Sequence, residues 1–252
     1  MKIKLFTIPN FLTLGNLLCG SLAVMFLNSL NVTESKDILN YLLILLFVSL
    51  LFDLLDGMVA RALKINSAIG LQLDSLADMV SFGLVPGFMM FNLLSGYTTP
   101  LNEGDFVSSK VQIDFVAYFG FFITLFSALR LAKFNIDTEQ ATYFKGLATP
   151  ANTILIFSLY WIYVQKGKIL SPEIDLYFLI GITILSCYLL VSNLPLFSFK
   201  FKGFSWKENH FKYIFMVVSL ILVIGFQMSA VPFIIILYII ISIIFRKKIE
   251  HA

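Results

Sequence analysis

Residues 53–78 read DLLDGMVARALKINSAIGLQLDSLAD and lie where two apolar segments of the chain meet. The stretch holds four aspartates, each next to Leu or Ala: Asp53, Asp56, Asp74 and Asp78. An ionisable side chain at membrane depth costs about 2.5–3.5 kcal/mol on insertion scales. Four of them close together therefore indicate a functional site rather than a source of stability.

The composition of the whole chain places this stretch in a membrane protein. Of the 252 residues, 59% are hydrophobic and 13% are charged, whereas soluble domains carry about 25% charged residues. A transmembrane helix needs about 20 mostly apolar residues. Eight segments fit this description: 8–30, 38–63, 67–96, 113–136, 150–165, 174–194, 211–228 and 229–246. We expect an all-α polytopic membrane helix bundle with about eight transmembrane helices.

These segments leave no room for a soluble domain. We therefore expect a single integral membrane domain over 1–252, with a core at about 8–194 and two additional C-terminal spans at about 211–246. No basic cluster stands on an exposed soluble face, so we expect no nucleic-acid partner. Membrane lipid is the expected surrounding partner.

The distribution of Lys and Arg predicts the orientation of the spans, because cytoplasmic segments carry the excess of positive charge. With the N-terminus inside, fourteen of the eighteen Lys and Arg residues fall in cytoplasmic segments and four fall outside. A seven-span chain would send the basic residues 246–248 to the outer side. We expect eight spans in the cell (inner) membrane, with both termini and residues 53–78 on the cytoplasmic side.

Helical periodicity gathers the polar residues of this stretch into two stripes. At 100° per residue, the polar residues of the first helix fall within an arc of about 100° of its surface. Those of the second helix fall within an arc of about 80°. The stripes consist of Asp53, Asp56, Gly57 and Ala60, and of Ser67, Gly70, Asp74, Asp78 and Ser81. Only residues 64–66 separate the two helices, so we expect them to be antiparallel neighbours. Two carboxylates from each would converge on one cavity.

Converging carboxylates repel one another unless cations lie between them. No His or Cys accompanies these aspartates, and oxygen ligands alone favour hard ions such as Mg²⁺, Mn²⁺ or Ca²⁺. Two such ions a few ångströms apart form the clamp used in phosphoryl chemistry. We expect a divalent metal cofactor, Mg²⁺ or Mn²⁺, with two ions bound.

The small residues and the arginine of the stretch allow two interpretations. Gly57 and Gly70 would let a ligand approach the backbone, or would let the helices pack closely. Arg61 would pair with a ligand phosphate, or would be one of the basic residues that flank the cytoplasmic ends of membrane helices. Their position on the carboxylate-bearing faces favours ligand contact.

The complete pattern is Asp53-x2-Asp56-Gly57-x2-Ala60-Arg61-x8-Gly70-x3-Asp74-x3-Asp78. At all eight positions it resembles the signature of the CDP-alcohol phosphatidyltransferase family. The resemblance implies a six-helix core, paired as a homodimer. It also implies that Asp53, Asp56 and Asp74 hold two metals on the CDP pyrophosphate.

For the remaining positions the resemblance implies the following roles. Asp78 would contact a metal and act as the catalytic base that deprotonates the acceptor hydroxyl. Gly57, Ala60 and Gly70 would make room for the cytidine, and Arg61 would bind phosphate. Ser67 lies on the same stripe and joins the expected CDP-lipid site.

Flanking segments are similar to the phosphatidylserine synthase branch of that family. They are residues 8–20 (IPNFLTLGNLLCG), Ser81-Phe82-Gly83 with Pro86, residues 128–135 (ALRLAKFN) and residues 146–151 (GLATPA). Ala148 replaces the first proline of a Gly-Leu-Pro-x-Pro-Ala segment. The resemblance implies CDP-diacylglycerol and L-serine as substrates, and phosphatidylserine and CMP as products.

A serine acceptor needs a cation near the reaction centre to hold its carboxylate. Arg130, Lys133 and Asn135 lie at the inner end of the fourth span, on the same side of the membrane as the aspartates. Arg130 and Lys133 are three residues apart and can share a helix face. We expect these three residues to bind serine; positive-inside anchoring is the alternative.

Other functions remain open at this point. Within the same family, the acceptor could be glycerol 3-phosphate, an inositol phosphate or another phosphatidyl lipid. From a different class, four membrane acids could form the ion path of a cation transporter. That alternative gives no reason for Arg61 or for the glycines at their spacings.

Overall fold

The computed structural model describes residues 5–30, 36–65, 67–97, 115–137, 144–167, 171–197 and 206–246. Its first half contains α1 (Ile8–Leu30), α2 (Lys36–Ala62), α3 (Ala68–Asp78), the π-helix η1 (Met79–Leu84), α4 (Val85–Ser95), α5 (Phe115–Tyr118), the 3₁₀-helix η2 (Phe119–Phe121) and α6 (Phe122–Ile136). Its second half contains β1 (Phe144–Lys145), α7 (Thr149–Lys166), α8 (Pro172–Val191), β2 (Pro195–Leu196), α9 (Trp206–Phe226), the 3₁₀-helix η3 (Gln227–Ala230) and α10 (Val231–Ile244).

The prediction of an all-α polytopic membrane fold is confirmed. Within the described ranges, six helical stretches are long and apolar enough to cross a membrane: 8–29, 37–62, 68–95, 115–136, 172–191 and 209–244. The last of these contains both predicted C-terminal spans, joined through η3. The predicted fifth span is helical as α7 but is not among the six. The number of membrane crossings therefore stays a prediction.

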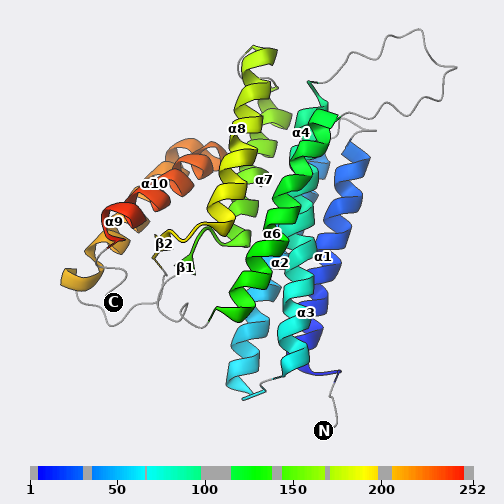
Figure 1. The fold of residues 1–252 in the computed structure, drawn as a ribbon, viewed down its shortest axis with the longest axis vertical. Coiled ribbons are helices and arrows are strands. Elements are labelled where there is room, and N and C mark those ends of the chain that lie inside the picture. Colours follow the sequence, from blue (N-terminus) through cyan, green and yellow to red (C-terminus); the bar gives the residue numbers. More distant parts are fainter. Residues whose placement is uncertain are drawn as a thin grey trace, which may run out of the picture.

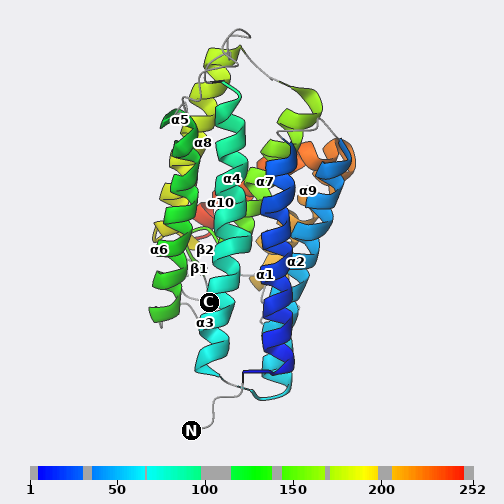
Figure 2. The same cartoon turned by 90° about the vertical axis from the view of Figure 1, so that its right-hand side faces the viewer.

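The helices form one bundle with an oblique hairpin beside it. Helices α1, α2, α3–η1–α4 and α6 stand side by side, and α7 and α8 pack alongside them (Figures 1 and 2). The hairpin α9–η3–α10 crosses next to α7 and α8 at a slant (Figure 1). Phe197, Phe211, Phe215 and Ile241 form the buried cluster that ties this hairpin to the end of the bundle.

The main hydrophobic core fills the end of the bundle away from residues 53–78. Leu27 of α1, Leu42 of α2, Met89 and Met90 of α4 and Ile156 of α7 are all fully buried there. Large apolar side chains elsewhere on these helices remain exposed. Lipid-facing surfaces of membrane helices are apolar, so this exposure suits a bilayer.

A tight turn joins α2 to α3. The backbone N–H of Ile65 donates to the carbonyl of Ala60 at 2.9 Å, and that of Lys64 donates to Arg61 at 3.2 Å. Lys64 adopts a positive φ of 54°, as the residue after a helix end does in this capping arrangement. The Ser67 hydroxyl then caps α3 by accepting from the N–H of Gly70 at 3.3 Å. The turn sends α3 back beside the helix that precedes it.

A π-helical turn follows Asp78, and Pro86 stands two residues after it. Proline has no backbone N–H, so the carbonyl of Phe82 loses its partner four residues later. The hydroxyl of Thr153 on α7 donates to that carbonyl at 3.1 Å, and the hydroxyl of Thr124 on α6 donates to the carbonyl of Gly83 at 3.0 Å. The π-turn is therefore fastened to both neighbouring helices.

Helix α1 approaches η1 closely at Gly20. A Cβ atom added there would lie 2.8 Å from the Cα of Ser81, a distance that real Cβ contacts do not reach. The Ser81 hydroxyl donates to the carbonyl of Asn16 at 3.0 Å and so joins the same two helices. Close packing through small residues is common between membrane helices.

We predict that Gly20→Ala destabilises the protein and that Gly181→Ala does not. Overpacking costs about 1–3 kcal/mol. A Cβ at Gly181 on α8 would meet no atom of the described residues within 4 Å, and alanine favours a helix by about 1 kcal/mol. Thermal unfolding of both variants in detergent measures the difference. Equal melting temperatures would show that α1 does not pack against η1 in this way.

Candidate active site

A pocket of about 480 Å³ opens where α2 ends and α3 begins. Its walls come from the first turns of α1, the last turns of α2 and the first turns of α3. The lining residues are Pro9, Asn10, Thr13, Asp56, Gly57, Ala60, Arg61, Ile65, Ser67, Ala68, Gly70, Leu71 and Asp74. Six of the eight positions of the sequence pattern thus line this one pocket.

Three carboxylates converge beside the pocket, and two of them, those of Asp56 and Asp74, line it. Ligand oxygens from Asp53, Asp56 and Asp74 all lie within 4.8 Å of one another. Asp56 is buried, and Asp53 and Asp74 are partly buried. Asp78 lies one turn further along α3, near enough to interact electrostatically with Asp53 and Asp74. The stripes on α2 and α3 therefore face each other.

Helix α1 holds two of these aspartates in place. The Thr13 hydroxyl donates to Oδ2 of Asp56 at 2.5 Å. The Asn16 amide donates to Oδ1 of Asp78 at 3.1 Å, and its own Oδ1 accepts from the Ser49 hydroxyl at 2.5 Å. Because a carboxylate only accepts hydrogen bonds, the N–H₂ group of Asn16 faces Asp78 and its oxygen is left to accept from Ser49.

These α1 residues are part of the site although the aspartate pattern does not include them. A signal was present, because Asn10, Thr13 and Asn16 recur at intervals of three in the first half of a mostly apolar helix. That spacing covers an arc of about 120° on one helix face. All three side chains are buried. A polar stripe on α1 therefore faces the aspartates of α2 and α3.

The small residues of the pattern lie where the pocket passes closest to the backbone. A Cβ on Gly57 would lie 3.4 Å from a guanidinium nitrogen of Arg61, so this side chain lies over Gly57. A Cβ on Gly70 would lie 3.3 Å from Oδ1 of Asn10. Arg61 is exposed at the pocket wall, and Ala60 and Ser67 are partly buried there.

The side chains present fit a hard divalent cation. The donor set consists of carboxylate oxygens, as Mg²⁺ and Mn²⁺ prefer. One oxygen of Asp74, Oδ1, is buried and has no hydrogen-bond partner among the described residues. Buried polar atoms in native proteins nearly always have a partner. A cation between these carboxylates would give Asp74 one.

The three residues predicted to bind serine lie on α6 and point to different partners. Arg130 is buried, lies over the ring of Phe134 at 5.2 Å and interacts electrostatically with Asp78. Asn135 donates to the Ser75 hydroxyl on α3 at 2.8 Å. Of the three, Arg130 is the one close enough to Asp78 for the two charges to interact.

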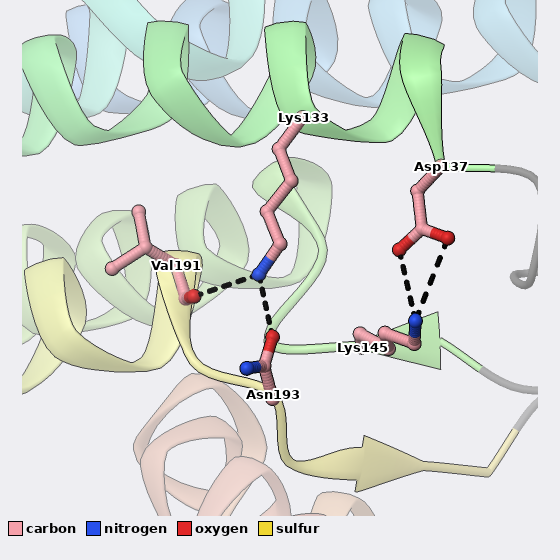
Figure 3. Close-up of polar contacts among 5 residues, drawn as sticks. All are labelled: Lys133, Asp137, Lys145, Val191 and Asn193. Carbon is pink, nitrogen blue, oxygen red and sulfur yellow. Dashed lines mark hydrogen bonds and ion pairs between the residues drawn. The ribbon is translucent and has the colours of Figure 1, made fainter.

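Lys133 instead reaches the end of α8. Its ammonium group donates to the carbonyl of Val191 at 3.1 Å and to Oδ1 of Asn193 at 2.7 Å (Figure 3). Next to it, Asp137 at the end of α6 pairs with Lys145 on β1 at 3.1 Å (Figure 3). These contacts fasten the inner end of α6 to α8 and to β1.

Comparison with known proteins gives several relatives. The chain is 33% identical to a CDP-diacylglycerol–serine O-phosphatidyltransferase of Methanocaldococcus jannaschii, over 61% of this chain and 60% of that relative. It is 31% identical to the Bacillus subtilis protein of the same name, over 57% of this chain and 69% of the relative. With the Helicobacter pylori protein of that name the identity is 30%, over 87% of this chain and 83% of the relative.

The family model for CDP-alcohol phosphatidyltransferases matches residues 6–191. This range starts before α1, includes the whole pocket and ends with α8, so it covers the six-helix part of the bundle and leaves out the oblique hairpin. The match covers far more than half of the chain. The chain belongs to the CDP-alcohol phosphatidyltransferase family.

Proposed function

We propose that this protein is a CDP-diacylglycerol–serine O-phosphatidyltransferase, which makes phosphatidylserine and CMP in phospholipid biosynthesis. The observation that carries the proposal is the meeting of three carboxylates from α2 and α3, two of which, those of Asp56 and Asp74, line a pocket that also contains Arg61. The choice of serine as the acceptor is supported by the relatives that bear this name. Family membership favours an enzyme over the cation transporter.

Asp53, Asp56, Asp74 and Asp78 would hold two divalent ions, Mg²⁺ or Mn²⁺. When bound, such ions neutralise a pyrophosphate and stabilise the charge on the departing CMP. Thr13 donates to Asp56 and so leaves its other oxygen for a ligand. Such supporting contacts keep metal ligands oriented.

The CDP part of the lipid substrate would lie along the small residues of the pocket. Gly57, Ala60 and Gly70 leave the α2 and α3 backbones open to it, and Ser67 lies at the start of α3. Arg61, whose guanidinium lies over Gly57, would bind a phosphate. The acyl chains would leave towards the surrounding lipid.

Asp78 would take the proton from the acceptor. As the serine oxygen bonds to the phosphatidyl phosphorus, the phosphorus–oxygen bond to CMP breaks and the hydroxyl proton passes to Asp78. Asn16 occupies Oδ1 of this carboxylate. The other oxygen, Oδ2, is the one we assign to the proton.

For the serine carboxylate we propose Arg130. It is the buried cation that interacts with Asp78. Lys133 and Asn135 already have partners at the end of α8 and on α3. They would shape this side of the site by holding α6 in place.

The setting of the enzyme is also part of the proposal. We propose that it lies in the cell membrane as one domain, with both termini and the pocket on the cytoplasmic side, as the Lys and Arg distribution predicts. We also propose a homodimer. Serine and CDP-diacylglycerol would then meet at the cytoplasmic surface.

The acceptor can be tested directly. Purified protein with CDP-diacylglycerol and Mn²⁺ or Mg²⁺ is offered labelled serine or labelled glycerol 3-phosphate, and the lipid headgroup is identified. We expect phosphatidylserine. If the label appeared only in phosphatidylglycerol phosphate, the protein would still carry out the family's reaction, but serine would be wrong as its acceptor.

We predict that Asp74→Asn lowers the rate of CMP release by about 100-fold or more. A metal that polarises a phosphoryl group contributes several kcal/mol to the barrier, and each 1.36 kcal/mol is about tenfold in rate. Asp37→Asn, at an exposed position on the other end of α2, is the matched control and should leave the rate unchanged. Near-normal CMP release by Asp74→Asn, with normal expression, would contradict the metal site.

We predict that Arg130→Gln raises the KM for serine by at least about tenfold and leaves the KM for CDP-diacylglycerol nearly unchanged. Hydrogen bonds to charged groups contribute about 1.5–3 kcal/mol. Lys133→Gln is the comparison, because the partners of Lys133 lie at the end of α8. This variant should lower the melting temperature without a selective increase in the KM for serine. The reverse pattern would assign the serine carboxylate to Lys133.

A further inference from the structure

Helix α7 begins inside the protein rather than at its surface. Thr149, its first residue, is 0% exposed, and Gly146 and Leu147 before it are buried too. No side chain caps this end. The first N–H groups of a helix have no partner within the helix and carry its positive dipole end. In α7, Pro150 has no N–H and the N–H of Asn152 donates to the carbonyl of Ala148 at 3.0 Å, so Thr149 and Ala151 carry the N–H groups left for a ligand. Such a terminus attracts an anion.

Two buried side chains at this terminus have no partners. The hydroxyl oxygen of Thr149 and both amide atoms of Asn152 make no hydrogen bond among the described residues. Asn152 is also 0% exposed. The two residues are three apart and share a helix face. Buried polar groups of this kind are rare in native proteins and point to a bound molecule.

The alignment of α7 with its neighbouring helix places this terminus at the same height along the bundle as Asp78. Helix α7 runs in the same direction as α3–η1–α4 (Figures 1 and 2). Thr153 donates to the carbonyl of Phe82. Thr149 comes four residues before Thr153, just as Asp78 comes four residues before Phe82, so the two lie at the same depth.

Arg130 lies at this depth as well. Helix α6 runs in the opposite direction, and Thr124 donates to the carbonyl of Gly83. Arg130 follows Thr124 by six residues, which brings it to the depth of Asp78 five residues before Gly83. The electrostatic interaction of Arg130 with Asp78 agrees with this register.

The end of α8 holds both helices together at this point. Lys133, one turn after Arg130, donates to the carbonyl of Val191 (Figure 3). The backbone N–H of Leu147, two residues before Thr149, donates to the carbonyl of Leu189 at 2.8 Å. The turn that carries Arg130 and the start of α7 are therefore fixed to the same last turn of α8.

We infer that the N-terminal turn of α7, with Thr149 and Asn152, forms the recognition site for the amino-acid part of the acceptor together with Arg130. The inference rests on the proposed function and extends it to residues on α7. The carboxylate of serine binds the helix terminus, the Thr149 hydroxyl and Arg130. Oδ1 of Asn152 accepts from the ammonium group, and the serine hydroxyl is left to face Asp78.

The chemistry of this site suits a zwitterion better than a phosphate. It combines one guanidinium and one helix terminus with two neutral side chains. The amide oxygen of Asn152 accepts hydrogen bonds and suits an ammonium group. An acceptor phosphate carries close to two negative charges and no ammonium group, so it would leave this oxygen without a donor. The site therefore selects an amino acid.

The test uses Thr149→Val and Asn152→Leu in the purified full-length protein. Both keep the size of the side chain nearly unchanged and remove its polar atoms. We expect each to raise the KM for serine and the dissociation constant of labelled serine at least tenfold, with the KM for CDP-diacylglycerol unchanged. The melting temperature without substrate should not fall, because the removed polar atoms make no hydrogen bond to any residue that the structure describes.

Two further variants serve as controls. Thr149→Ser keeps the hydroxyl and should keep the serine KM. Thr183→Val removes a buried hydroxyl that donates to the carbonyl of Leu179 on α8, and it should leave the serine KM unchanged. If it did not, the effect of Thr149→Val would not be specific to this site.

The outcomes separate this inference from the proposed function. If the wild type makes phosphatidylserine and both α7 variants keep the serine KM, the recognition site is wrong and the proposed function stands. If the variants lose stability and catalysis together, with unchanged serine binding, their side chains have a structural role only, and the inference is overturned. If the wild type neither binds serine nor makes phosphatidylserine, both are overturned.

Discussion

The repulsion among four carboxylates at one end of an apolar bundle is the interaction on which the site depends. Asp53, Asp56 and Asp74 have oxygens within 4.8 Å of one another, and Asp78 interacts with them from one turn away. In a medium of low dielectric constant such charges repel strongly. The fold tolerates this cost because α1 donates hydrogen bonds to Asp56 and Asp78, and because hard cations suit the remaining oxygens.

The rest of the bundle holds these carboxylates in register. The short turn at Lys64 returns α3 beside α2, and the absence of a side chain at Gly20 lets α1 approach η1. Pro86 frees the carbonyl of Phe82, which Thr153 of α7 then binds. That contact joins the aspartate-bearing helix to α7 and brings the start of α7 to the same height along the bundle as Asp78. The proposed metal site and the proposed acceptor site are thus linked through one π-turn.

The sequence was enough to predict the membrane fold and the facing stripes on α2 and α3. The helical period and the three-residue connection between the helices make the side chains of Asp53 and Asp74 face each other. Neither feature depends on contacts between residues far apart in the sequence. The same helical period marks Thr13 as part of a polar stripe, but it does not identify its partner Asp56, which lies 43 residues along the chain. The partner of Lys133 is 58 residues away, on α8. The unpartnered amide of Asn152 depends on the packing of several helices, so only the structure reveals it.

Direct measurement of metal binding tests the central claim, that the facing carboxylates of α2 and α3 share divalent cations. Detergent-solubilised protein without substrates would be titrated with Mn²⁺ and followed by electron paramagnetic resonance. The account predicts saturable binding of two Mn²⁺ per chain, with a spectrum broadened by coupling between neighbouring ions, and loss of that coupling in Asp53→Asn. No saturable binding, or an unchanged spectrum in Asp53→Asn, would contradict it.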